Sequence, residues 1–306
     1  MRPAEPPRAA DGPTWTALSS PSSVRAVALA VGGLNTRSDV IFADIAAALG
    51  EQGVAVYALA LSGHRVDPAT ERATPGAFGH VGFADWEDEV IAAGRALRAH
   101  HEGLPRLGIG YSIGGAAMLL AHVREPAFDG LVGLAPAIAM TPLTRALNRL
   151  NHGLTAAVGL ERWAWRRTAL PVRYRANDHV PATALITGED AQRRFADLGT
   201  EALEPLRDRL TVIMRDGDSV ISARRVRRFV AEHDLRADWC AVPPGDAWAH
   251  EVFDRLTLGD AWDRVLGRIV DRLERIIAPA GREARMRSRS RPPSVDPAEM
   301  QRNRRR

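Results

Sequence analysis

The sequence has 306 residues, and among them there is no lysine and only one cysteine, Cys240. A disulfide framework within the chain is therefore excluded, and nothing argues for an oxidising compartment. There is also no CxxC pair and no His/Cys cluster of the kind that holds structural zinc. We accordingly predict no metal site and no cofactor. The absence of lysine indicates a compositional bias that leaves arginine as the carrier of positive charge.

Long apolar runs are missing as well. The first apolar run, residues 26–31 (AVALAV), is far shorter than the roughly 20 residues of a membrane-spanning helix. It also lies too far from the N-terminus for a typical signal peptide, and the segment before it, rich in proline and alanine, has no apolar core. A cytoplasmic protein is therefore the expectation.

Both ends of the chain lack the apolar periodicity of a packed element. We predict that residues 1–22 and 279–306 are disordered. The C-terminal segment contains the runs RSRSRPP and RNRRR and carries much of the net charge of +4. Such charge runs are most often solvated ends, so no specific nucleic-acid partner is expected. The tail is a candidate for weak contact with an anionic surface.

Between these ends, short apolar runs alternate with helical periods. Continuous apolar strands are typical of a sheet buried on both faces, and their alternation with helices predicts a mostly parallel sheet. Ser38 is expected to cap the first helix and Gly53 to end it. The predicted strands are residues 25–31, 54–61, 106–111, 129–136, 210–215 and 237–243, and the predicted helices are 38–53, 84–101, 113–125, 221–233 and 261–276.

The alternation is interrupted by residues 137–205, which contain two helical periods followed by an irregular segment. This interruption predicts a helical insertion that lies over the sheet. The predicted organisation is thus a core in two parts, residues 23–136 and 206–278, with a cap at 137–205 between them.

One serine lies between glycines in Gly110-Tyr111-Ser112-Ile113-Gly114. A residue on a sharp strand-to-helix turn has a strained backbone, and the residues two before and two after it must be small. The turn raises the serine hydroxyl above the carboxyl end of the sheet, beside the positive end of the helix. With a predicted strand before it and a helix after it, the pattern predicts Ser112 as a nucleophile.

A serine nucleophile needs a base within hydrogen-bonding reach and an acid that orients the base. On a turn of this kind, the acid and then the histidine follow the serine in the chain. His250, in a loop after the last predicted strand, is the candidate base. Asp218 is the preferred acid because its strand leads directly to that of His250. Asp216 is the nearest alternative, and Asp190 is a second one because TALITG can form a strand.

The oxyanion of an acyl-transfer intermediate needs two N–H donors. The amide of Ile113 follows the nucleophile and is the first candidate. The second is the amide of Leu34 in the loop VGGLN, where Gly32 and Gly33 allow the backbone to approach the serine closely.

The ordered set of motifs VGGLNTRSD, YALALSGH, GYSIGG, FDGLVGLAPAIAM, DGDSVIS and AHEVFD resembles the α/β-hydrolase superfamily. Within it, the chain is most similar to the monoacylglycerol lipase, lysophospholipase and serine aminopeptidase S33-like group. The resemblance extends from about Val24 to Ile277. It departs from the family at the oxyanion loop, where Gly32-Gly33 replaces the usual His-Gly.

The resemblance implies a mostly parallel sheet flanked by helices with a cap insertion. It also implies Ser112 as nucleophile, Asp218 as acid and His250 as base, with the amides of Leu34 and Ile113 as oxyanion hole. The cap is expected to offer apolar groups to an acyl chain.

The expected activity is that of a serine hydrolase that cleaves a carboxylic ester through an acyl-enzyme. The substrate would be a small molecule, either an acylglycerol, a lysophospholipid or a small ester. A thioesterase or peptidase of the same fold, or a catalytically silent binding protein, are the alternatives. The sequence does not decide among them, nor does it fix the oligomeric state.

Overall fold

The computed structural model describes residues 14–64, 81–157, 165–167, 172–176, 179–181, 184, 186–243 and 250–290. Within this part of the chain, seven strands form one sheet in the order β1-β3-β2-β4-β5-β8-β9. Neighbouring strands are parallel except β1 and β3, which are antiparallel. The strands are β1 (Thr14–Ser19), β2 (Ala26–Val31), β3 (Val54–Ala60), β4 (Arg106–Tyr111), β5 (Gly130–Leu134), β8 (Leu210–Arg215) and β9 (Asp238–Val242).

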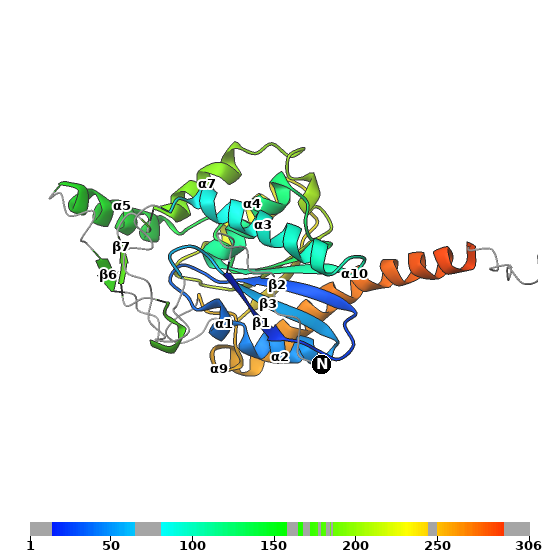
Figure 1. The fold of residues 1–306 in the computed structure, drawn as a ribbon. Coiled ribbons are helices and arrows are strands. Elements are labelled where there is room, and N and C mark those ends of the chain that lie inside the picture. Colours follow the sequence, from blue (N-terminus) through cyan, green and yellow to red (C-terminus); the bar gives the residue numbers. More distant parts are fainter. Residues whose placement is uncertain are drawn as a thin grey trace, which may run out of the picture.

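Helices cover both faces of this sheet (Figure 1). One face carries α3 (Phe83–His100) and α4 (Ser112–Arg124), and the other carries α1 (Ser38–Ile41), α2 (Ala43–Glu51) and α10 (Trp262–Ser290). Every residue of β2, β5 and β8 is buried, as the continuous apolar runs predicted. The predicted mostly parallel sheet flanked by helices is therefore confirmed.

The helix predicted over residues 38–53 is two helices, α1 and α2, which are separated at Phe42. Gly53 follows them with a φ of 74°, as expected of a glycine that ends a helix. The prediction that Ser38 caps the helix was wrong. Its hydroxyl instead accepts a hydrogen bond from the N–H of Gly32, 3.0 Å away, because the loop after β2 folds back over the start of α1.

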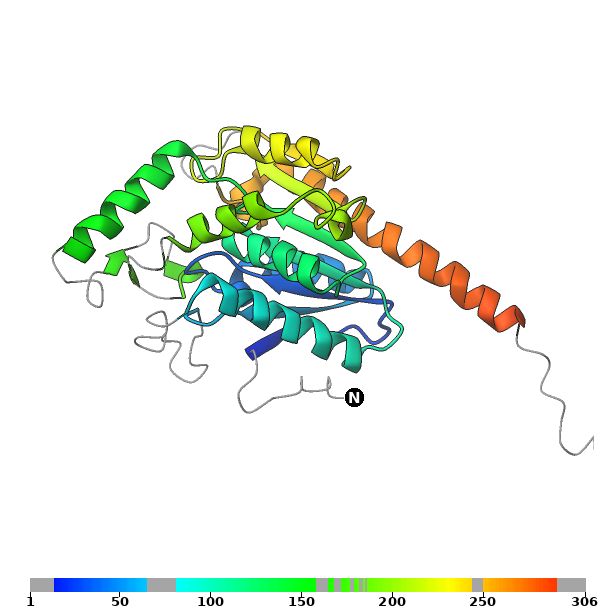
Figure 2. The same cartoon turned by 90° about the horizontal axis from the view of Figure 1, so that it is seen from above.

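Both predicted disordered ends contain regular structure. Within residues 1–22, β1 pairs with β3, and Trp15 packs on Tyr57 with ring centroids 5.5 Å apart. Within residues 279–306, α10 continues as a helix to Ser290 and extends away from the rest of the molecule (Figures 1 and 2). The tail was predicted to be disordered from its charge; its arginine, alanine and glutamate residues favour a helix, whereas Pro279 and Gly281 in the same stretch disfavour one.

The insertion at 137–205 is helical in part. It contains α5 (Pro142–Ala157) and α7 (Thr187–Asp197), and also a two-stranded antiparallel sheet of β6 (Trp165–Arg167) and β7 (His179–Pro181) that the sequence did not predict. The short 3-10 helices η1 (Val172–Tyr174) and η2 (Glu204–Leu206) complete its described elements. After β8 come α8 (Ala223–Glu232), α9 (Arg255–Leu258) and η3 (Gly259–Ala261).

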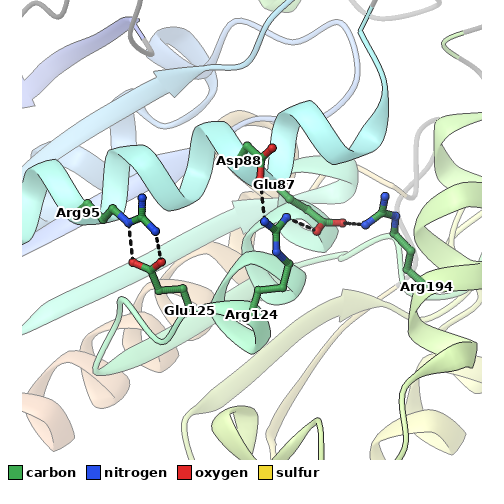
Figure 3. Close-up of polar contacts among 6 residues, drawn as sticks. All are labelled: Glu87, Asp88, Arg95, Arg124, Glu125 and Arg194. Atoms are coloured by element: carbon green, nitrogen blue, oxygen red, sulfur yellow. Dashed lines mark hydrogen bonds and ion pairs between the residues drawn. The ribbon is translucent and has the colours of Figure 1, made fainter.

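A buried carboxylate joins the insertion to the core (Figure 3). Glu87 on α3 pairs with Arg124 of α4 at 3.2 Å and with Arg194 of α7 at 2.8 Å, and its side chain is almost completely buried. A buried charge is stable only where it is paired in this way, so α7 is fixed against α3 and α4.

No helix among the residues that the structure describes is long and apolar enough to cross a membrane.

Candidate active site

The turn between β4 and α4 has the geometry that its glycines predicted. Ser112 has a φ of 51°, a left-handed conformation that is rare for a residue with a side chain. A Cβ on Gly114 would lie 2.0 Å from the carbonyl oxygen of Gly32, and one on Gly110 would lie 2.5 Å from the Cα of Gly115. Glycine is therefore required on both sides for the serine to take this position.

Ser112, His250 and Asp218 form a continuous hydrogen-bonded chain. The Nε2 of His250 lies 2.8 Å from the Oγ of Ser112, and its Nδ1 lies 2.9 Å from Oδ2 of Asp218. Because an ionised carboxylate only accepts hydrogen bonds, Nδ1 carries the proton of the neutral ring and Nε2 can accept one from the serine. The structure thus brings together three side chains that are far apart in the sequence.

The carboxylate of Asp218 is fixed on both of its oxygens. Its Oδ1 accepts hydrogen bonds from the backbone N–H groups of Val220 and Ile221, 2.8 Å and 2.9 Å away, while Oδ2 faces the imidazole. The side chain is fully buried. This turn holds the carboxylate in one orientation before any substrate arrives.

The alternative acids lie elsewhere. Asp216 pairs with Arg227 at 3.0 Å, and its side chain is 49% exposed. Asp190 pairs with Arg193 in the first turn of α7. TALITG spans residues 183–188, and the described part of it, residues 184 and 186–188, contains no strand, since α7 begins at Thr187.

The residues whose backbone amides are predicted to form an oxyanion hole, Leu34 and Ile113, line the same cavity as Ser112. The N–H of Ile113 is in the first turn of α4, where amides have no partner within the helix. The carbonyl of Gly33 accepts hydrogen bonds from the N–H and the hydroxyl of Thr36, 3.2 Å and 2.9 Å away. Since no peptide bond in the described residues is cis, the N–H of Leu34 points to the opposite side from that carbonyl.

The histidine loop is held by a residue that sequence reasoning missed. Arg215, the last residue of β8, is buried and donates from Nε to the carbonyl of Glu251 at 2.9 Å and from Nη1 to the carbonyl of Pro243 at 3.0 Å. It therefore holds the backbone on both sides of the loop that carries His250. The sequence signal for this role is the position of Arg215 at the end of the apolar run LTVIM. A cation buried there needs hydrogen-bond partners nearby.

The imidazole of His250 packs against Tyr111, with ring centroids 5.2 Å apart. Burial raises the pKa of Tyr111 well above its usual value, and the nearby charges of Glu251 and Asp218 raise it further. Burial also raises the pKa of Glu251, and Asp254 adds to this effect. Tyr111 is therefore a neutral, fixed surface beside the imidazole of His250.

A cavity of about 400 Å³ opens at Ser112. The core and the insertion both contribute to its wall, and most of the side chains are apolar or small. No carboxylate or arginine is among the described residues that line it. The lining consists of Leu34, Ser112, Ile113, Ala137, Met140, Leu143, Thr144, Leu147, Asn148, Thr187, Gly188, Ser219, Val220 and Ile221.

The first two turns of α5 form the outer wall of this cavity. Leu143 and Leu147 line it, yet their side chains are 68% and 47% exposed. Sequence reasoning did not identify these residues, because a leucine spacing of four on a helix predicts core packing equally well. Among the described residues there is also no group of three or more His, Cys, Asp or Glu side chains that could hold a metal ion.

The arrangement of strand, serine turn, acid loop and histidine loop agrees with a comparison to known families. Residues 22–236 match the model of the serine aminopeptidase S33 family. The chain belongs to this family. A search of curated proteins found no match.

Solved structures that share the fold of this chain include lipases and esterases. A soluble variant of monoglyceride lipase from Saccharomyces cerevisiae, solved with a substrate analogue, is 13% identical with a TM-score of 0.63 and covers 86% of this chain and 93% of its own. A monoacylglycerol lipase from Paleococcus ferrophilus is 16% identical with a TM-score of 0.59, covering 85% and 99%. A carboxyl esterase from Bacillus coagulans is 16% identical with a TM-score of 0.60, covering 84% and 92%. At these identities the likeness establishes the α/β-hydrolase fold.

Proposed function

We propose that this protein is a serine hydrolase that cleaves carboxylic esters of small molecules through an acyl-enzyme. The observation that carries the proposal is the hydrogen-bonded chain from Asp218 through His250 to Ser112, with the serine in the wall of an apolar cavity. A nucleophile, a base and an orienting acid in mutual contact are what acyl transfer requires.

In the first half of the reaction, the Oγ of Ser112 attacks the ester carbonyl while Nε2 of His250 takes the hydroxyl proton. The carbonyl oxygen becomes an oxyanion that accepts hydrogen bonds from the amides of Leu34 and Ile113. The ester C–O bond then breaks, the imidazolium gives its proton to the departing alkoxide, and the acyl group stays on the serine. Asp218 stabilises the imidazolium throughout.

In the second half, a water molecule attacks the acyl-enzyme. His250 takes a proton from that water, the oxyanion forms again on the same amides, and the carboxylic acid leaves as the proton returns to Ser112. Each proton that the imidazole accepts is thus returned within one cycle.

The lining of the cavity favours an acyl substrate over a peptide with a free N-terminus. A peptide's ammonium group would need a carboxylate or carbonyl partner, and the described lining residues offer no carboxylate. Apolar walls instead favour an acyl chain. The names of the lipase and esterase structures with this fold are consistent with such a substrate.

The test is hydrolysis of p-nitrophenyl butyrate by the purified protein, together with labelling by a fluorophosphonate probe. Ser112→Ala should lose both labelling and turnover, by about 10⁴-fold or more, and should keep its melting temperature. Ser23→Ala, in the exposed loop before β2, is the matched control and should behave as the natural protein. Unlabelled natural protein would instead favour a catalytically silent binding protein.

A further inference from the structure

A second and larger cavity, of about 800 Å³, lies at the opposite end of the strands from Ser112, where β4, β5 and β8 begin. Four arginines line it: Arg98 near the end of α3, Arg106 at the start of β4, Arg209 before β8, and Arg275 on α10. β4 runs from this cavity to the serine turn, and the six residue steps from Arg106 to Ser112 span roughly 20 Å. A molecule bound here would therefore not touch the reacting atoms.

The positive charge of this cavity exceeds the negative charge of its lining. Only Glu102 and Asp129 are acidic among the described lining residues. Arg98 donates to the neutral carbonyl of Pro126 at 2.6 Å, and Arg275 shares the carboxylate of Asp238 with Arg272.

Two of these arginines are poorly satisfied. Arg106 approaches Asp129 only at 3.4 Å through Nε, and its buried Nη1 has no hydrogen-bond partner among the described residues. Arg209 makes no side-chain hydrogen bond or ion pair within the described part of the chain, although its backbone carbonyl accepts one from Leu131. Buried donors are nearly always paired, so the unpaired Nη1 of Arg106 is unusual, whereas the guanidinium of Arg209 is exposed and would meet an acceptor that entered this cavity.

The helix that contributes Arg275 to the cavity, α10, has further arginines in its sequence beyond Ile276. Ile276 forms part of the cavity's apolar wall, and the helix then leaves the body of the molecule (Figure 2). Between Gly281 and Ser290 the sequence places arginine at positions 282, 285, 287 and 289.

We propose that this cavity binds a phosphate-bearing organic molecule. Guanidinium groups match phosphate oxygens in geometry as well as charge, and several converging arginines favour phosphate over a single carboxylate. The volume exceeds that of an isolated phosphate, and Ile276 with Leu104 and Pro105 offers apolar contact to an organic part. The phosphate could belong to a free phosphorylated compound or to the headgroup of a phospholipid, and the chemistry of recognition is the same.

The experiment titrates the full chain with inorganic pyrophosphate by calorimetry at low ionic strength, with sodium chloride at matched ionic strength as the reference. A second arm measures co-sedimentation with phosphatidylcholine vesicles that contain phosphatidic acid. Arg209→Gln should weaken binding about tenfold, and Arg209→Gln with Arg275→Gln should abolish it, because each removes a charge-assisted contact. Arg209 is exposed, and Asp238 still pairs with Arg272 when Arg275 is replaced. Both variants should therefore fold.

Arg228→Gln, an exposed arginine on α8, is the matched control and should bind as the natural protein does. Arg209-dependent binding in either arm supports the proposal, and the arm in which it occurs identifies the source of the phosphate. Absence of saturable binding in both arms overturns it, as does an equal loss in Arg228→Gln. Ester hydrolysis should be the same in all these variants, so this outcome is independent of the proposed activity.

Discussion

Arg215 donates a hydrogen bond from Nε to the backbone carbonyl of Glu251, 2.9 Å away, and thereby ties the end of β8 to the residue after His250. The same guanidinium also holds Pro243 on the other side of the loop. The position of the imidazole over Ser112 thus depends on a cation that has no contact with the cavity.

Replacing this cation should slow the reaction without weakening substrate binding. Arg215→Met loses both hydrogen bonds and should lower kcat about 10²-fold with KM nearly unchanged, because small displacements of a base are costly. Steady-state kinetics with p-nitrophenyl butyrate measures this split. Arg227→Met, an exposed arginine on α8, is the control and should keep kcat. A change in KM alone would show that Arg215 does not position His250.

The two neighbouring aspartates provide a matched pair. Asp218→Asn can still accept hydrogen bonds from the amides of Val220 and Ile221, but it no longer fixes the imidazole tautomer, so kcat should fall about 10⁴-fold. Asp216→Asn removes only an exposed ion pair, whose worth is small, and should leave kcat unchanged. Equal effects of the two substitutions would refute the assignment of the acid.

Acid should destabilise the fold through a buried histidine. The Nδ1 of His122 faces the N–H groups of Ala127 and Phe128 at 3.3 Å, and burial lowers the pKa of His122 to about 4. The unfolded chain takes up this proton near pH 6.5, so the free energy of unfolding should decline as the pH falls from about 6.5 to about 4, by about 3 kcal/mol.

Urea unfolding at pH 7.5 and at pH 4.5 measures this loss. His122→Asn should be less stable at the higher pH, since its amide cannot reproduce the ring's contacts, but it should lose less stability on acidification. His64, whose pKa burial also lowers to about 4, contributes a similar decline and remains present in both proteins. An identical pH dependence in the variant would rule out His122 as a source.

The leucines of α5 should set the preference for acyl length. Leu147→Trp fills part of the cavity, so kcat/KM for p-nitrophenyl decanoate should fall about tenfold relative to the butyrate ester. Leu154→Trp lies on the same helix with a 60% exposed side chain but outside the cavity lining, and it should change neither rate. An unchanged ratio in Leu147→Trp would place the acyl chain elsewhere.

The parallel sheet could be predicted because each of its strands is a short apolar run followed by a helical period. β1 could not, because Thr14–Ser19 follows a proline-rich segment and owes its conformation to pairing with β3. Likewise, the hydroxyl of Ser38 binds the distant N–H of Gly32 instead of its own helix, a contact that local propensity does not encode.

The candidate site divides in the same way. Ser112 could be predicted because the turn that holds it demands glycines at fixed spacing. Asp218 and Asp216 could not be separated by spacing, since the choice depends on which carboxylate faces the imidazole and which faces Arg227. Leu143 and Leu147 could not be predicted as cavity residues from the sequence, because the packing of the insertion on the core determines which residues of α5 line the cavity.

The insertion's helices α5 and α7 are attached in different ways. α7 is bound to the core by the buried carboxylate of Glu87, whereas α5 reaches α7 through the ion pair of Arg149, which is 64% exposed, with Glu189, beside a hydrogen bond from Arg145 to Gln192. Dissolved ions screen the second contact far more than the first. The cavity therefore has one rigid wall and one compliant wall, and any widening to admit a bulky ester would take place on the side of α5.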